Sequence, residues 1–151
     1  MYLLIDQPVH RLSQGSRFLL WAMRSWATAA SAGTGPFAAL EPAFEGMGVA
    51  TALPAFNTVM AMLDSDGLEK LGLAPIGSTR IGEDEAILLT LWSASLDPAN
   101  HGRRDGTLAL LVAEEAVSPI ACALDEATPI LAEIGLAPAG IATHDNQEAG
   151  R

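Results

Sequence analysis

The stretch GEDEAILLTLWSASLD, residues 82–97, opens with three acids and continues into a run of aliphatic residues and one tryptophan. Carboxylates favour the positive end of a helix dipole, which predicts that a helix begins here. Ile87, Leu88, Leu91 and Trp92 share one face of this helix, and two further leucines widen it. A helix that is apolar on more than one side is usually buried between neighbours. We therefore predict that this segment is the central helix of a helical domain.

The composition also favours helices. Half of the 151 residues are hydrophobic, 17% are charged and only 5% are aromatic. Strands draw on Val, Ile, Tyr, Phe and Thr, whereas the apolar content of this chain is mainly Ala, Leu, Gly and Met. A chain of this length can form one domain with its own core. We predict an all-α fold, a single compact bundle of about five to six helices joined by short loops.

Prolines mark most of the other expected helix starts. We expect helices to begin at Pro8, Pro36 and Pro54, because proline suits the first turn of a helix. Pro119 is expected at the start or in the first turn of the last helix. Pro129 should kink that helix, because proline removes a backbone donor.

The remaining segments are less regular. Residues 99–106 (ANHGRRDG) are expected to form a mobile loop. Residues 107–112 (TLALLV) are too short to be assigned by periodicity; we favour a helix, with a strand paired to residues 2–5 as the alternative. We assign residues 1–137 to a single helical domain. Residues 138–151 have no apolar periodicity and are expected to form a flexible tail.

The charge of the chain is negative and unevenly distributed. The net charge is −10; residues 1–40 carry three basic residues and one acid, and residues 41–151 carry five basic and seventeen acidic residues. Nucleic-acid binding depends on Lys and Arg that neutralise phosphates, so no nucleic acid is expected as a partner. The acidity favours solubility, and a basic partner or a cation is the alternative.

The sequence predicts a cytoplasmic protein. The one cysteine, Cys122, cannot form an intrachain disulfide, and its apolar neighbours predict a buried, inert thiol. The N-terminal MYLLIDQPVHR lacks the basic region and long apolar run of a signal peptide. The longest uncharged run, 46–63, is interrupted by Gly, Pro and polar residues, so no membrane span is expected.

No recognised catalytic, metal or cofactor motif is present. His10, His101 and His144 lie far apart, and none has a second ligand at metal-binding spacing on a shared helix face. The segment 64–69 (DSDGLE) does not match the register of a calcium-binding loop. The consecutive acids at 83–85 point in different directions on a helix and do not form a carboxylate pair. We predict no catalytic residue, metal or cofactor, and an enzyme is the least favoured class.

The most distinctive group of residues lies on the first expected helix. Arg17, Trp21 and Arg24 lie at i, i+4 and i+7 and form a stripe. We favour arginines that pair with acids inside the fold, because the rest of the chain is strongly acidic. A self-association face is the second alternative. A small anionic ligand is the third, since two guanidiniums flanking an indole can hold a carboxylate or phosphate. Asn57, in an apolar run, is a further candidate to orient a ligand or to fix helix register.

The segments GEDEAILLTLW and TLALLV…ILAEIGL resemble small uncharacterised bacterial all-helical domains of unknown function. The resemblance covers roughly residues 56–136 and implies no activity. We predict a non-enzymatic protein-interaction or self-association domain, with a helical small-ligand-binding or regulatory domain as the alternative. The ligand or interface candidates are Arg17, Trp21, Arg24 and Asn57.

Overall fold

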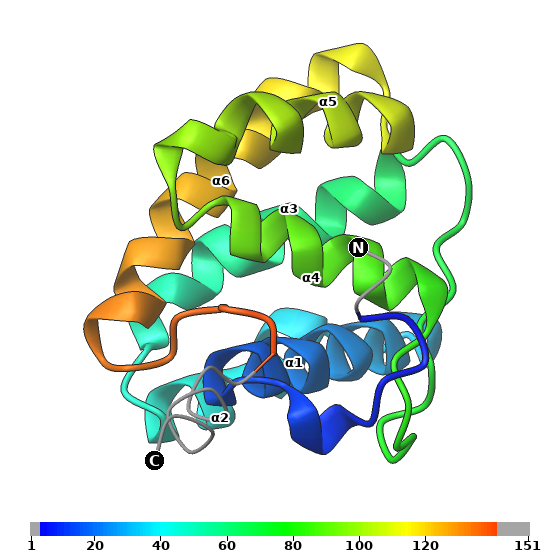
Figure 1. The fold of residues 1–151 in the computed structure, drawn as a ribbon. Helices are drawn as coiled ribbons and strands as arrows, with labels where there is room; N and C mark the ends of the chain where they lie inside the picture. The colour runs from blue at the N-terminus through cyan, green and yellow to red at the C-terminus, as the bar shows by residue number, and fades with distance from the viewer. Residues whose placement is uncertain (1–3, 142–151) are drawn as a thin grey trace, which may run out of the picture.

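Six α-helices form the fold in the computed structural model, which describes residues 4–141 (Figure 1). The helices are α1 (Gln14–Ser31), α2 (Pro36–Gly46), α3 (Leu53–Ser65), α4 (Glu83–Ala94), α5 (His101–Leu111) and α6 (Glu114–Glu133). Short 3₁₀ turns precede α1, α3 and α5, at Val9–Arg11, Ala50–Ala52 and Pro98–Asn100. No strand forms within residues 4–141, and the all-α prediction is confirmed.

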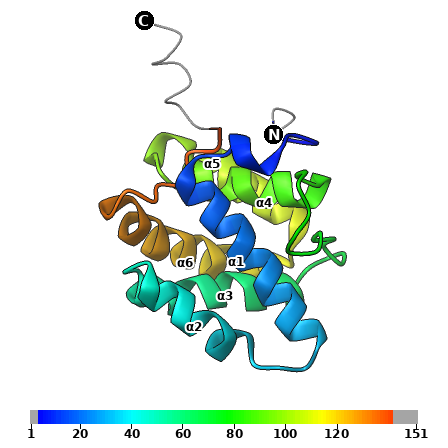
Figure 2. The same cartoon turned by 90° about the horizontal axis from the view of Figure 1, so that it is seen from below.

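The helices surround one hydrophobic core. α3 packs against α2 and α6, and α4 packs against α1 and α5 (Figures 1 and 2). The predicted helix in residues 82–97 is α4, which buries Leu88, Leu89 and Trp92 almost completely. The Trp92 ring stacks on Phe56 of α3 with 5.9 Å between the ring centroids. α4 therefore contributes large apolar side chains to the middle of the core.

The first helix begins at Gln14 rather than at Pro8. Ser13 caps it, because the Ser13 hydroxyl accepts a hydrogen bond from the Ser16 amide at 3.2 Å. Gly15 follows in the first turn, where a Cβ would clash with the carbonyl oxygens of Leu136 and Ala137. The start of α1 therefore packs closely against the backbone of residues 136–137.

Residues 138–141, expected to belong to the tail, pack against this same start of α1. The Ser13 amide donates to the Gly140 carbonyl at 2.6 Å, and the Gly140 amide donates to the Ser16 hydroxyl at 2.8 Å. Pro138 is buried. The packed part of the chain therefore extends past the expected boundary at 137. The rest of the expected tail lies outside the described residues.

The polar segment 99–106 is not a loop, contrary to the sequence prediction. It forms a 3₁₀ turn and the first half of α5, and its Arg104 is buried. The inner face of this half-helix is charged rather than apolar, so hydrophobic periodicity could not reveal it. Residues 107–111 continue the same helix, which confirms the favoured assignment of that run.

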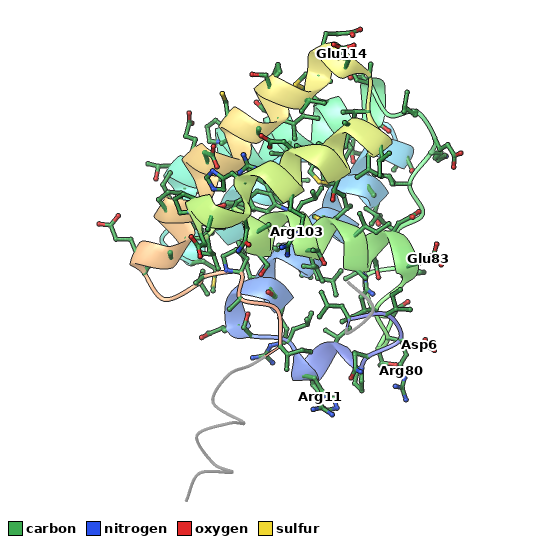
Figure 3. The ribbon with its side chains drawn as sticks, turned by 45° about the horizontal axis from the view of Figure 1, so that its top comes forward. Asp6, Arg11, Arg80, Glu83, Arg103 and Glu114 are labelled. Atoms are coloured by element: carbon green, nitrogen blue, oxygen red, sulfur yellow. The ribbon has the colours of Figure 1, made fainter. Side chains whose placement is uncertain are left out.

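The alternative pairing of residues 2–5 with 107–112 does not form over the described residues. The N-terminal segment instead meets the loop before α4: the Asp6 amide donates to the Ile81 carbonyl at 2.8 Å. The Arg80 guanidinium donates to the Asp6 carbonyl at 3.0 Å. Figure 3 shows Asp6 and Arg80 close together at one end of the molecule.

The last helix begins at Glu114, earlier than the expected start at Pro119. Glu114 and Glu115 occupy its first turn, where carboxylates are favourable. α6 continues through both Pro119 and Pro129, so neither proline ends it.

Candidate functional site

Arg24 is the centre of a buried hydrogen-bonded cluster between α1, α4 and the loop that precedes α4. Its Nε donates to Glu85 Oε2 at 2.7 Å, and its Nη2 donates to Glu85 Oε1 at 2.8 Å. The same guanidinium donates to the carbonyls of Ser78 and Arg80 at 2.8 and 2.9 Å. The Arg24 and Glu85 side chains are only 2% and 0% exposed. Arg24 therefore pairs with an acid inside the fold, which was one of the alternatives for the stripe.

Glu85 is also held by backbone amides. The amides of Ala74 and Gly82 each donate to its carboxylate at 2.9 Å. Burial raises the pKa of Glu85. The Arg24 hydrogen bonds, these amides and the Arg24 charge together lower that pKa by more than burial raises it. The pKa of Glu85 is therefore below its ordinary value, and the buried carboxylate is charged.

Residues 66–82, between α3 and α4, form a long segment without an α-helix that we call the strap (Figure 1). Its first part is attached to the α5–α6 junction, because the Leu68 amide donates to the Leu111 carbonyl at 2.8 Å. Its second part is attached to α4, because the Gly72 amide donates to Asp84 Oδ2 at 2.6 Å. Asp84 and Glu85 therefore have two roles: they lie in the first turn of α4, and they accept hydrogen bonds from the backbone of the strap.

A cavity of about 490 Å³ lies between the ends of α1 and α3 and the strap. Its inner lining is apolar and buried, and comes from Trp26, Met60, Leu63 and Leu88. Its outer lining is exposed and mixed: Ser31, Asp64, Glu69 and Lys70 are polar, whereas Ala30 and Leu68 are apolar. Small-molecule sites typically measure about 300–1,000 Å³ and combine an apolar lining with a few polar groups. This cavity is our candidate functional site.

The indole of Trp26 is fixed in the wall of the cavity by Asn57. Its Nε1 donates to Asn57 Oδ1 at 2.8 Å. Asn57 is half-buried on α3, so the hydrogen bond joins α3 to α1. The sequence-predicted candidate Asn57 therefore acts on the cavity by positioning a ring and does not itself line it.

The other two residues of the stripe remain at the surface. Arg17 is exposed, and Trp21 is 37% exposed. The Trp21 ring stacks on Phe18 with 6.2 Å between centroids. The structure thus does not bring Arg17, Trp21, Arg24 and Asn57 together in one site: two are exposed on α1, and two make separate contacts inside the fold.

A second buried arginine joins α5 to its neighbours. Arg104 donates to Asp105 Oδ1 and to the Ser95 hydroxyl, each at 3.0 Å, and also to Asp125 of α6. Burial lowers the pKa of Arg104, but its bonds to Asp125 and Asp105 raise it more, so the guanidinium stays charged. His101 Nε2 lies 3.5 Å from Asp125 Oδ1. Because Arg104 is already bonded on several sides, we assign this cluster a structural role.

The thiol of Cys122 is exposed on α6, which corrects the expectation that it is buried. It lies in a shallow hollow of about 260 Å³ between α3 and α6. The apolar residues around Cys122 in sequence belong to the inner face of the helix, whereas the cysteine lies on the outer face.

The sequence does not single out Trp26 or the rim formed by residues 64–70 as parts of a site. The rim residues belong to a helix end and an irregular segment, and such segments have no periodicity that could link them to α1. One usable signal was present: a tryptophan in an apolar stripe needs a hydrogen-bond acceptor when it is buried, and Asn57 was a candidate acceptor.

Comparison with known proteins gives no match: no family model, no curated protein and no solved structure is similar to this chain. The resemblance to small bacterial helical domains therefore stays an expectation. Within residues 4–141, no group of three or more His, Cys, Asp and Glu side chains is arranged to hold a metal ion. In that same part of the chain, none of the helices has the length and apolar character needed to cross a membrane.

Proposed function

We propose that this chain binds a small amphipathic molecule in the cavity between α1, α3 and the strap. The observation that supports the proposal is the arrangement of the lining: buried apolar side chains lie inside, and the exposed residues at the opening include four polar or charged side chains beside Leu68. A ligand with an apolar body and a polar end matches both parts. Burial of the apolar body would supply most of the affinity, and the polar rim would orient the ligand.

The walls of the cavity are attached to the fold from several sides. Asn57 fixes the Trp26 ring, and Asp84 holds the strap at Gly72. A site whose walls are already ordered loses less conformational entropy when a ligand binds. These contacts therefore support a preformed site.

The polar rim has unused hydrogen-bonding capacity. Within the described residues, the side chains of Asp64, Glu69 and Lys70 make no hydrogen bond or ion pair with the protein. They are exposed, so a ligand can reach them without breaking a contact in this part of the chain. This availability supports ligand binding at the opening.

The proposal can be tested with two matched variants, each of which replaces one alanine with tryptophan. Ala30 lines the cavity from α1, and Ala39 is exposed on α2 away from it; both are helical. Ala30→Trp should fill the cavity, whereas Ala39→Trp adds the same ring to the surface. Native mass spectrometry of protein purified without refolding should show a small-molecule adduct in the parent chain and in Ala39→Trp, and none in Ala30→Trp.

A panel of aromatic amines, acids and alcohols provides a second readout for the same variants. We expect at least one member to raise the melting temperature of the parent chain and of Ala39→Trp, but not of Ala30→Trp. If the parent chain carries no adduct and no panel member stabilises it, the proposed function is wrong. Equal stabilisation of all three chains would place binding elsewhere.

Self-association through α1 is a second candidate function, and exposed Trp21 beside Arg17 is the observation that favours it. Tryptophan and arginine are enriched at interface anchors, and Arg17 is complementary to the acidic surface of a second copy. Trp21→Ala should then lower the mass of the assembly in native mass spectrometry. An unchanged assembly mass would exclude this face as the interface. Because Arg24 is buried in its pair with Glu85, the stripe has less polar surface than the sequence indicated.

A further inference from the structure

We infer that the ligand of the α1–α3–strap cavity is an organic cation, an amine or quaternary ammonium group on an apolar body. The inference rests on the proposed binding function and adds the charge of the ligand to it. Two features of the opening favour positive charge, and the net charge of the chain adds to them.

The first feature is the pair of helix ends that border the cavity. Ala30 and Ser31 in the last turn of α1, and Leu63 and Asp64 in the last turns of α3, all line it. The C-terminal end of a helix carries a partial negative charge of about half an electron, which favours a cation nearby. Neither helix has a basic residue in its last turn, so no side chain of these turns compensates that charge.

The second feature is the balance of charged side chains at the rim. Asp64 and Glu69 contribute two carboxylates, whereas Lys70 contributes the one cation among the residues that line the cavity. An anionic ligand would meet one favourable charge, that of Lys70, and the repulsion of both carboxylates and both helix ends. A cationic ligand is attracted by the two carboxylates and the two helix ends and is repelled by Lys70.

The inner wall of the cavity contributes one aromatic ring. Trp26 is the one aromatic residue that lines the cavity, and Asn57 holds its indole in place. The fixed ring is an apolar surface for the body of the ligand. The net charge of −10 adds a long-range field that draws cations toward the molecule. These features together distinguish a cationic ligand from a neutral or anionic one of the same shape.

The test uses three probes of nearly the same shape and different charge: para-trifluoromethyl-phenethylamine, the corresponding phenylethanol and the corresponding phenylpropionate. Fluorine NMR titrations of the full chain give the dissociation constant of each probe. We expect the amine to bind about tenfold more tightly than the alcohol, as the combined effect of exposed carboxylates and helix ends, and the acid to bind most weakly. Added salt should reduce the difference.

Two double variants locate the origin of this preference. Asp64→Asn with Glu69→Gln removes both rim carboxylates, and Glu41→Gln with Glu45→Gln removes two exposed carboxylates of α2 that do not line the cavity. Both double variants change the net charge equally. We expect the first to reduce the preference for the amine to about twofold, and the second to leave it unchanged.

The outcomes separate this inference from the proposed function. If the alcohol or the acid binds as tightly as the amine, the inference of a cationic ligand is overturned and the binding site itself is retained. If the two double variants lose the preference equally, net charge rather than the rim causes it, and the inference is likewise overturned. If none of the three probes binds at the cavity, the inference of a cationic ligand is overturned, whereas the proposed function is decided by the adduct and the ligand panel described above.

Discussion

Arg24 of α1 and Glu85 of α4, 61 residues apart in sequence, form a buried ion pair with two hydrogen bonds. The pair also organises the strap, because Arg24 binds the Ser78 carbonyl and Glu85 binds the Ala74 amide. The side chains of the pair thus bond to the backbone of a segment that has no helix of its own. Removal of either partner would leave an uncompensated charge in the interior.

We predict that Glu85→Gln lowers the free energy of unfolding at pH 7 by about 3–5 kcal/mol, the typical cost of breaking a buried ion pair. The matched control is Glu83→Gln, which changes an exposed acid in the same helical turn and should alter stability by less than about 0.5 kcal/mol. Urea denaturation measures both. Equal losses in the two variants would show that the pair does not stabilise the fold.

The Glu85 pair should also make the parent chain sensitive to acid. The pKa of Glu85 in the folded chain is below its ordinary value of 4.5, so the unfolded chain binds the proton more readily. The contribution of Glu85 is therefore present above pH 4.5 and is lost as the pH falls through the lowered folded pKa. Urea denaturation from pH 7 to about pH 3 should show a steeper acid loss in the parent chain than in Glu85→Gln. Parallel curves would contradict this assignment.

Gly15 and Gly102 should respond to alanine in opposite directions. In Gly15→Ala the new Cβ clashes with the Leu136 carbonyl, so the start of α1 and the 136–141 segment must separate. We expect a loss of at least about 2 kcal/mol. Gly102→Ala adds a methyl group to an exposed helical position with nothing within 4 Å and should gain about 0.5–1 kcal/mol. Thermal unfolding measures whether each variant is more or less stable than the parent chain. A gain of stability in Gly15→Ala would contradict the close contact between Gly15 and Leu136.

Arg104 should be important to the fold although its segment is polar. Arg104→Ala removes hydrogen bonds to α4 and α6 and should lower the free energy of unfolding by about 2–3 kcal/mol. The neighbouring exposed Arg103 is the control, and Arg103→Ala should cost less than about 0.5 kcal/mol. Urea denaturation distinguishes them. If the order of the two losses were reversed, the placement of α5 would be wrong.

Asn57 should stabilise the fold because it accepts the hydrogen bond of the Trp26 indole. Asn57→Ala leaves the buried Trp26 N–H without its acceptor, which should cost about 1–3 kcal/mol and change the tryptophan emission. Thr58→Ala changes an exposed neighbour on the same helix and should leave both readouts close to the parent values. Chemical denaturation followed by tryptophan fluorescence measures both effects. Unaltered emission in Asn57→Ala would contradict the hydrogen bond.

Local patterns in the sequence predicted the helices that bury apolar faces. α4 was predicted because its acids precede a wide apolar face, and α2 was predicted because Pro36 starts a short run with Phe44 on its buried side. The same reasoning failed for the first half of α5, whose inner face carries Arg104 instead of a leucine. A buried charge is recognisable only together with its partner, and Asp125 lies on another helix.

The candidate site could be predicted only in part, because long-range contacts build it. Asn57 was singled out as a polar residue in an apolar run, and its partner Trp26 is 31 residues away. Pairing of Arg24 with an acid inside the fold is one of the alternatives that the sequence offers, but the partner, Glu85, lies on another helix and cannot be named from the stripe. The cavity depends on the strap, whose path is determined by bonds to α4 and to the α5–α6 junction and by no local pattern.

The measurement that tests the central claim most directly is an amide NMR titration of the full chain with para-trifluoromethyl-phenethylamine. The claim is that the cavity between α1, α3 and the strap is the binding site. We predict saturable shifts concentrated in residues 26–31, 60–64 and 67–73 and at Leu88, which together contain the residues that line the cavity. Saturable shifts centred on α5 and α6, or shifts spread over the surface without saturation, would contradict the claim.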